Sequence, residues 1–551
     1  MKTVRIPQTK PTSFVRALLT LLCLLLGLPV VGVLAAWFEL DAAAWATLSH
    51  QVSTVLSGYS LQSAVLSGGV AVGVMLLGTA TAVAVTLFDF PGRRTFEWAL
   101  LLPLAMPAYV LAYAWTDALQ PSGLLQAWLR QHTGAQGALW PDIRSLGGAV
   151  GLFVLVLYPY VYLLARTALG ERAAQLLEAA RLLGAGPRRR VLAVALPLAR
   201  PAITAGVALA VMETLADYGV GAYFGLSTFS TGIFKAWLVM DDRMAAAQLA
   251  SVLLAVVALL LWVERRAQQH LRFGTTRRTG GSEARPQRLR GGAALAAWGL
   301  CALPVLLGFL LPVGWLVWML MQEVRYAEFG LPLARFAGWA WASFRLATTA
   351  ALLATGLALA LGFALRPVGG VRRGLLGPAA GLLALGYAVP GTVLAVGVLA
   401  PVGLVQSAWP EAPAAALVTG TVFGVMAAYL SRFSAVALQS VQAGYARIST
   451  NVDETARLLG AGRWRLFGRL HLPLLKRSAL AAGLLVFVDV MKELPATLML
   501  RPFGSDTLAV VAYNFARDER LGEAALPSLA IVAVGLIPVL LLSAAMRQRA
   551  E

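Results

Sequence analysis

The sequence predicts an all-α integral membrane protein with about twelve transmembrane helices, arranged as two parallel six-helix repeats. Of the 551 residues, 59% are hydrophobic and only 13% are charged, and the mean hydropathy is +0.74. Soluble domains are roughly half apolar and about one quarter charged, so this composition excludes an ordinary soluble fold. The two further observations behind the prediction are a series of long apolar segments and an internal duplication of the chain.

Apolar runs long enough to cross a bilayer, which takes about 20 residues, recur along the whole chain. In the first half these runs lie near residues 13–36, 64–88, 96–118, 147–168, 201–224 and 245–263. In the second half they lie near 292–320, 343–365, 374–400, 412–434, 478–500 and 523–546. The first run follows a basic stretch, but its length favours a retained helix over a signal peptide.

The predicted domains follow from these runs. Residues 1–263 form the first repeat, with a core at 61–263, and residues 292–551 form the second, with a core at 341–546. Between them, the polar and glycine-containing stretch 264–291 is predicted to be a cytoplasmic linker. Because each half has an even number of spans, the halves share one orientation, and such parallel repeats place a transport pathway at their interface.

The net charge of +19 is explained by the predicted topology. With the N-terminus inside, the cytoplasmic segments contain Lys2, Arg5, Lys10, Arg16, Arg93, Arg94, Arg188, Arg189, Arg190, Arg372, Arg373 and the basic stretches 265–290 and 463–477. Cytoplasmic loops of membrane proteins carry such an excess of Lys and Arg. We therefore expect both termini in the cytoplasm and the lipid bilayer as surroundings, and no nucleic acid as a partner.

Cysteine and histidine usage argues against covalent or metal-based chemistry in this chain. The two cysteines, Cys23 and Cys301, lie inside predicted spans, which excludes a disulfide framework. The four histidines are scattered without ligand spacing, so no preformed metal site is expected. No nucleophile, base and orienting group occur together, so an embedded enzyme is disfavoured.

A nearly identical segment occurs twice, 276 positions apart counted from Glu178 to Glu454. It reads Glu178-Ala-Ala-Arg-Leu-Leu-Gly-Ala-Gly186 and Glu454-Thr-Ala-Arg-Leu-Leu-Gly-Ala-Gly462. Good helix formers followed by glycine, and in the first copy by proline, predict a helix that stops at the glycine. A small-residue face and a fixed carboxylate suit contact with a partner. The candidate contact residues are Glu178, Ala179, Ala180, Gly184, Gly186, Glu454, Thr455, Ala456, Gly460 and Gly462.

In both copies nine residues follow the first glycine and precede an apolar-x-Leu-Pro ending, at Val194 to Pro197 and at Leu470 to Pro473. This spacing resembles the cytoplasmic signature loop of permeases in binding-protein-dependent ABC importers; Thr455 departs from the motif's first alanine. The resemblance implies the type I importer permease fold, two separate ABC ATPase subunits and an external substrate-binding protein. The alternative is a pair of ordinary amphipathic loops inherited by duplication.

The chain lacks the Gly-x-x-x-x-Gly-Lys-Ser/Thr phosphate loop, so it cannot bind ATP by that route. The resemblance implies that ATP and Mg are held by the partner subunits and that this chain has no cofactor of its own. We therefore expect a transport permease and not an enzyme. An ion-coupled secondary transporter remains the alternative in a different mechanistic class.

Charged residues lie inside the fifth predicted span of each half, where they are costly and usually mark a pathway. With the offset of 276, Glu213 matches Asp489 and Asp217 matches Glu493, so each half has two carboxylates at i and i+4 on one expected helix face. Together with Lys492 these four are the candidate pathway residues, suited to a hard cation. The alternative is that Lys492 pairs with a neighbouring acid and the carboxylates stabilise packing.

An acidic-acidic-basic triplet precedes the last span of each half, on the outer side. The triplets are Asp241-Asp242-Arg243 and Asp518-Glu519-Arg520. Asp242, Arg243, Glu519 and Arg520 are candidates for docking a soluble binding protein. The alternative is that these charges are solvated or pair within their own turns.

Two further strings narrow the resemblance. Glu213-Thr-Leu-Ala-Asp-Tyr-Gly219 and Lys492-Glu-Leu-Pro-Ala-Thr497 look like the fused permeases of bacterial ferric-iron importers. This implies a multi-pass protein of the bacterial inner membrane that transports ferric iron. Thiamine and phosphonate permeases share the fused plan, so both substrates stay open at this point.

Overall fold

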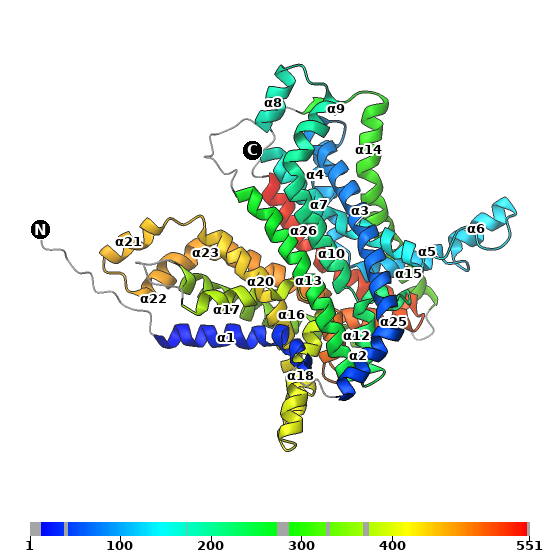
Figure 1. The fold of residues 1–551 in the computed structure, drawn as a ribbon. Coiled ribbons are helices and arrows are strands. Elements are labelled where there is room, and N and C mark those ends of the chain that lie inside the picture. Colours follow the sequence, from blue (N-terminus) through cyan, green and yellow to red (C-terminus); the bar gives the residue numbers. More distant parts are fainter. Residues whose placement is uncertain are drawn as a thin grey trace, which may run out of the picture. The chain divides into compact units, whose positions relative to one another are not determined.

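The computed structural model describes residues 13–37, 42–171, 174–272, 286–326, 331–366 and 374–547. It is helical apart from one parallel pair of two-residue strands, β1 (Phe88–Asp89) and β2 (Gln287–Arg288) (Figure 1). Several predicted cytoplasmic charges, namely Lys2, Arg5, Lys10, Arg372, Arg373 and those within linker residues 273–285, lie outside the described residues.

The first half contains α1 (Ser13–Gly32), η1 (Val33–Trp37), α2 (Ala42–Thr54), α3 (Leu56–Leu87), α4 (Arg93–Ala99), η2 (Leu102–Ala105), α5 (Ala108–Leu119), α6 (Leu124–Thr133), α7 (Leu146–Glu171), α8 (Ala174–Leu182), α9 (Pro187–Arg189), η3 (Arg190–Ala195), α10 (Leu196–Ala216), α11 (Gly219–Tyr223), α12 (Phe229–Leu238) and α13 (Arg243–Arg272).

The second half contains α14 (Gly292–Val305), η4 (Leu306–Leu310), α15 (Leu311–Tyr326), α16 (Leu333–Leu365), α17 (Leu376–Leu383), η5 (Gly386–Ala388), α18 (Gly391–Ala408), α19 (Ala414–Thr419), α20 (Phe423–Tyr445), α21 (Thr450–Leu458), α22 (Arg463–Arg465), η6 (Leu466–His471), α23 (Leu472–Lys492), α24 (Pro495–Leu500), α25 (Leu508–Arg517) and α26 (Leu521–Arg547).

The chain forms two compact units that do not coincide with the two sequence halves. Unit 1 comprises Met1–Leu40 and Trp341–Thr507, and unit 2 comprises Asp41–Ala340 and Leu508–Glu551. Each unit therefore contains helices from both halves of the sequence. The repeat boundaries at 1–263, 264–291 and 292–551 stay a sequence-based prediction.

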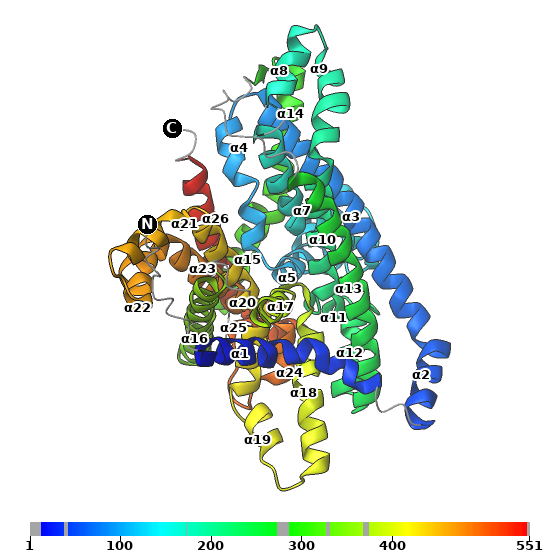
Figure 2. The same cartoon turned by 60° about the vertical axis from the view of Figure 1, so that its left-hand side comes forward.

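In unit 1, helix α1 packs against α17 and α18 (Figures 1 and 2). Small residues permit this contact: a Cβ on Gly397 would collide with the carbonyl oxygen of Pro29, and one on Gly27 would meet the side chain of Leu382. Glycine at such positions lets helix backbones approach closely, as is common between membrane helices. Helices α20 and α23 form the other main contact of this unit.

In unit 2, helices α3, α7 and α10 pack together, and α13 packs against α10. Here too glycine sets the distance between helices, since a Cβ on Gly78 would lie 2.7 Å from the carbonyl oxygen of Tyr158, and one on Gly206 would lie 2.7 Å from the Cα of Val161. The last helix, α26, packs against α15 and α25 of the same unit.

Nine helices among the described residues are long and apolar enough to cross a membrane, and the helix pair 93–105 and 108–133, bent by 90°, makes a tenth if the pair is counted as one span. The all-α membrane fold is thereby confirmed. The predicted span at 374–400 is divided into α17 and α18. The spans predicted at 412–434 and 478–500 correspond to α20 and α23. These two helices are not among the nine, because polar side chains such as Arg432, Lys476 and Arg477 make them less apolar.

The duplication extends to the lengths of four consecutive elements in each half. Helix α8, α9, η3 and α10 reappear with unchanged lengths as α21, α22, η6 and α23, each shifted by the offset of 276 residues. The same local structure thus forms twice, once in unit 2 and once in unit 1.

Candidate functional site

The helix in each predicted contact loop ends at a left-handed glycine. In the first loop (residues 174–197), Gly184 has φ 78° and donates to Arg181 O at 3.0 Å, while the next amide, Ala185, donates to Ala180 O at 2.9 Å. In the second loop (residues 450–473), Gly460 has φ 80° and the equivalent bonds measure 2.9 and 2.9 Å. This pair of bonds is the Schellman termination, which requires a positive φ and therefore favours glycine.

The predicted contact residues lie on accessible surface in both loops. Glu178, Ala179, Gly184 and Gly186 are exposed in the first, as are Glu454, Thr455, Gly460 and Gly462 in the second, while Ala180 and Ala456 are half-buried. The sequence reasoning missed a leucine pair beside each glycine. Leu182 and Leu183 are 83% and 87% exposed, and Leu458 and Leu459 are 72% and 82% exposed. Adjacent exposed leucines at a repeated position indicate a protein contact surface.

A buried polar network anchors the second loop. The Nε2 of His471, which is fully buried in η6, lies 2.8 Å from Asp453 Oδ1 in α21. The other carboxylate oxygen of Asp453 pairs with Arg366 at the end of α16. Arg366 also donates to the carbonyls of Ile448 and Ser449, at 2.9 and 3.0 Å, just before α21. The network therefore joins α21 to α16 and to η6.

The contacts of His471 suit a neutral imidazole. Its Nε2 faces a carboxylate and so bears the hydrogen, while Nδ1 accepts from the Tyr445 hydroxyl at 3.2 Å. Burial lowers the pKa of His471, against the opposing effect of Asp453. The sequence analysis gave His471 no role because the histidines lack metal-ligand spacing. The signal that could have found it is a difference between the two copies: Asp453 and His471 of the second copy are replaced by Leu177 and Ala195 in the first.

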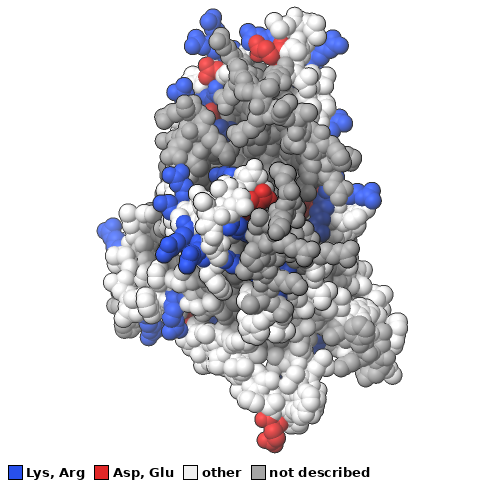
Figure 3. Space-filling model, turned by 90° about the vertical axis from the view of Figure 1, so that its left-hand side faces the viewer, with Lys and Arg blue, Asp and Glu red and all other residues white. Residues whose placement is uncertain are grey.

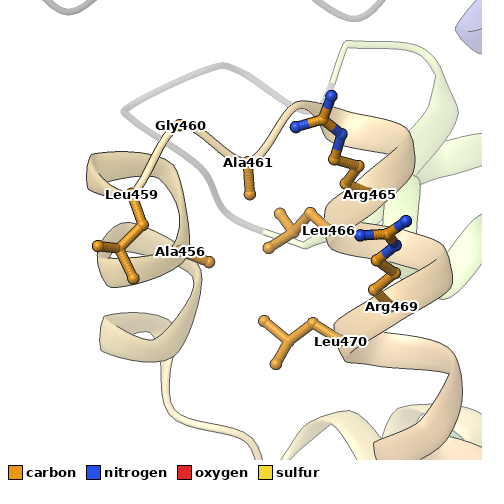
Figure 4. Close-up of a pocket in the computed structure, with 8 residues that line it drawn as sticks. All are labelled: Ala456, Leu459, Gly460, Ala461, Arg465, Leu466, Arg469 and Leu470. Carbon is orange, nitrogen blue, oxygen red and sulfur yellow. The ribbon is translucent and has the colours of Figure 1, made fainter.

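A hollow of about 330 Å³ lies between α21 and η6 in the second loop. Figure 4 shows Leu466 and Leu470 pointing from η6 toward α21, with Ala456 opposite them. The side chains of Arg465 and Arg469 lie at its rim. Lys and Arg side chains gather on the face that bears α21 and α22 (Figure 3), as expected of a cytoplasmic loop.

The first loop is attached differently. Arg190, the first residue of η3, donates to the side chain of Gln287 at 2.6 Å. Gln287 belongs to β2, which pairs with β1 and continues with Leu289 donating to Asp89 O at 2.8 Å. Gln287, near the C-terminal end of the predicted linker, is therefore bonded to Arg190 of the first loop.

The second carboxylate of each transmembrane pair lies beyond the helix, which corrects the expectation of one shared helix face. Helix α10 ends at Ala216, and Asp217 is extended, with φ −71° and ψ 132°; Glu493 follows α23 with φ −70° and ψ 121°. Both side chains instead cap the next short helix. Asp217 accepts from Val220 N at 2.8 Å, and Glu493 accepts from Ala496 N at 3.0 Å.

Ion pairing differs between the two sets of charges. Lys492 lies 3.6 Å from Asp489, as the packing alternative anticipated. Glu493 is 5% exposed, and besides its two amide donors it accepts from the Thr497 hydroxyl at 2.6 Å and from Arg432 at 3.5 Å. Glu213 is half-buried in α10 of unit 2. Because the two sets belong to different units, their convergence on one axis stays a prediction.

The four docking candidates Asp242, Arg243, Glu519 and Arg520 each have a partner within unit 2. Asp242 caps α13 by accepting from Ala245 N at 2.8 Å, and Arg243 stacks on Trp237. Glu519 is left-handed with φ 59° and accepts two bonds from Arg144, at 2.8 and 2.9 Å, while Arg520 pairs with Glu523. Arg144, which the sequence reasoning did not single out, also stacks on Tyr223.

Comparisons with known proteins assign this architecture. Residues 74–272, from α3 to α13, match the family described as "Binding-protein-dependent transport system inner membrane component". The chain is also 26% identical to the Fe(3+)-transport system permease protein FbpB 2 of Haemophilus influenzae, over 95% of this chain and 97% of that protein. The chain is a binding-protein-dependent permease. The match over both halves fits the type I importer permease fold with two fused repeats.

Shorter relatives match parts of the permease. It is 28% identical to the sulfate transport system permease protein CysT of Escherichia coli, over 46% of this chain and 91% of that protein. It is 26% identical to the putative 2-aminoethylphosphonate transport system permease protein PhnU of Salmonella choleraesuis, over 33% of this chain and 64% of that protein. The permease is thus a multi-pass inner membrane component and not a catalytic subunit, and its family implies an ATPase and a binding protein as partners.

Proposed function

We propose that this permease imports ferric iron, with two ABC ATPase subunits engaging the first and second loops and a binding protein delivering the substrate from outside. The observation that supports the substrate is the extent of the match to the ferric-iron permease, which covers 95% of this chain, whereas the sulfate and phosphonate relatives match 46% and 33%. Only the first of these relatives shares the whole two-repeat plan.

The geometry of the loops supports ATPase coupling. Each presents an exposed glutamate and an exposed leucine pair on a helix that a Schellman turn links to a following helical segment. That segment, η3 or η6, continues directly into the helix that bears Glu213 or Asp489. A displacement of the loop by a closing ATPase dimer would therefore reach the charged part of the transmembrane region through one connected helical run.

The charges of the fifth spans suit a hard cation. Carboxylate oxygen is the ligand type that hard cations prefer, and each half places two carboxylates within five residues. In this proposal ATP and Mg reside on the partner ATPases, the termini lie in the cytoplasm, and the permease itself needs only to pass the ion.

Reconstitution tests the proposal. The permease, its two ATPases and its binding protein are placed in vesicles, and uptake of radioactive ferric iron is measured with ATP, with a non-hydrolysable analogue, and with a proton or sodium gradient alone. ATP-dependent iron uptake that needs the binding protein supports the proposal. Uptake driven by a gradient without the partners indicates a secondary transporter, and selective uptake of sulfate, phosphonate or thiamine corrects the substrate.

A further inference from the structure

The buried start of α18 in unit 1 has unsatisfied hydrogen-bond donors. Gly391, Thr392 and Val393 are all buried, and among the described residues none of their three backbone amides has an acceptor. Pro390, which precedes them, offers no side-chain cap. The first amides of a helix are normally capped by side chains, water or a ligand, and a buried end without such partners is unusual.

Two side chains add further donors at the same point. The Thr392 hydroxyl is fully buried and has no partner among the described residues. Arg432 of α20 is 9% exposed, and its buried Nε is likewise unpaired there. The guanidinium reaches the helix start, because a Cβ built on Gly391 would lie 3.1 Å from Arg432 Nη1. An unsatisfied buried donor carries a substantial desolvation cost, larger when it is charged.

Glu493 satisfies this group of donors only in part. Its two oxygens are engaged by the amides of Ala496 and Thr497 and by the Thr497 hydroxyl, at 2.6 to 3.0 Å, whereas Arg432 reaches it only at 3.5 Å. Arginine has five N–H donors, and among the described residues only Nη1 of Arg432 has an acceptor. The remaining charged neighbours are Asp489, which interacts electrostatically with Arg432, and Lys492, which pairs with Asp489.

We propose that the amides of Gly391, Thr392 and Val393, the Thr392 hydroxyl and the Arg432 guanidinium form a binding site for an oxyanion. Helix N-termini favour anions through their oriented N–H groups and the helix dipole. Arginine binds planar or tetrahedral oxyanions through two parallel N–H bonds. Glycine at position 391 is required because a larger side chain would collide with Glu493 and Arg432.

The site belongs to the second half alone. The first half repeats the motif as Pro107-Ala-Tyr-Val-Leu-Ala112, matching Pro390-Gly-Thr-Val-Leu-Ala395. However, α7, the counterpart of α20, has no charged residue from Leu146 to Ala165, and alanine and tyrosine replace Gly391 and Thr392. Two sources of the oxyanion are distinguished by the test below: the transported solute itself, and an anion that accompanies a transported trivalent cation.

Equilibrium binding tests the site without ATP, ATPases or binding protein, so its result is independent of whether iron is transported. Radioactive inorganic phosphate is titrated against the full-length permease in detergent, at constant ionic strength set with chloride. We expect saturable binding and a matching rise in melting temperature. Arg432→Lys, which keeps the charge but not the planar donors, should weaken binding about tenfold. Thr392→Val should weaken it less, and Thr355→Val, which removes another buried unpaired hydroxyl in the same unit, should have no effect.

Should Arg432→Lys fail to fold, the double variant Arg432→Gln with Glu493→Gln removes both charges together and should abolish phosphate binding. Repeating the titration with and without ferric iron separates the sources: phosphate binding alone indicates an oxyanion solute, and binding only in the presence of iron indicates an accompanying anion. Absence of saturable binding under both conditions, or binding that Arg432 and Thr392 variants leave unchanged, overturns the proposal.

Discussion

Asp453 and His471 are joined by a 2.8 Å hydrogen bond that closes the base of the second loop, whereas the matching positions of the first loop are Leu177 and Ala195. The duplication has therefore preserved the length and turn geometry of both loops but not the way each is fixed to its unit. Asp453 links α21 to η6 through His471 and to the end of α16 through Arg366. This difference leads to the first prediction.

Asp453→Asn should destabilise unit 1 and reduce coupling at the second loop. The substitution leaves Arg366 buried without a carboxylate, and removing one partner of a buried ion pair costs about 3–5 kcal/mol. Thermal unfolding of the purified permease measures the first effect, and iron transported per ATP hydrolysed measures the second. Leu177→Asn at the matching position of the first loop is the control. Equal losses in both variants would show that the network has no special role.

The stability of the permease should fall in mild acid because of His471. Its pKa in the unfolded chain is about 6.5, and burial lowers the pKa of His471 in the folded protein. As the pH drops through about 6.5, the unfolded chain gains a proton that the folded protein does not, so the free energy of unfolding decreases. Melting temperatures of wild type and His471→Gln at pH 7.5 and 5.5 test this: the wild type should lose more, and parallel losses would exclude His471 as the cause.

Gly460→Ala should cost about 1 kcal/mol or slightly more, because alanine strongly disfavours the left-handed conformation that this position adopts. Steric contact does not contribute, since a Cβ at Gly460 would meet nothing within 4 Å. Gly468, in the helical segment of the same loop, is equally open but has no positive φ. Gly468→Ala is therefore the matched control and should be neutral or stabilising in the same unfolding measurement.

Local chemistry made the loops predictable from sequence. A run of good helix formers ending at glycine determines both the helix and its Schellman turn, and the structure places Gly184 and Gly460 in that turn. The ends of the fifth spans were not predictable in this way. Glu493 is fixed by Arg432, 61 residues earlier, and by amides of α24, and such distant partners leave no periodic signal in the sequence around Glu493.

The span predicted at 412–434 shows a second reason why some features could not be predicted from the sequence. Its residues are mostly apolar, but the structure places α19 and a break before α20 begins at Phe423. Alanine favours a helix wherever that helix begins, so an alanine-rich composition gives the presence of a span more reliably than its bounds. The proposed oxyanion site was also not found from the sequence. The matching prolines, Pro107 and Pro390, are 283 positions apart, so an alignment of the halves with the offset of 276 does not pair them.

Replacing Glu178 and Glu454 together with arginine should reduce transport to background while membrane insertion stays intact. Both carboxylates are exposed and neither has an ion-pair partner among the described residues, so the substitution alters a contact surface and not the fold. ATP-driven uptake and copurification of the ATPase are measured on the same preparation. Normal uptake by a correctly inserted variant would remove the coupling role from these residues.

The transmembrane carboxylates should separate into two classes. Glu493→Gln removes a buried cap and the partner of Arg432 and should lower stability. Glu213→Gln and Asp489→Asn alter half-buried side chains within their helices and should slow ferric iron more than they alter folding, since a neutral amide loses the attraction for a hard cation. Uptake rates normalised to folded protein, compared with ATP hydrolysis by the same complexes, distinguish the classes. Iron uptake unchanged in the Glu213 and Asp489 variants would assign these carboxylates to packing.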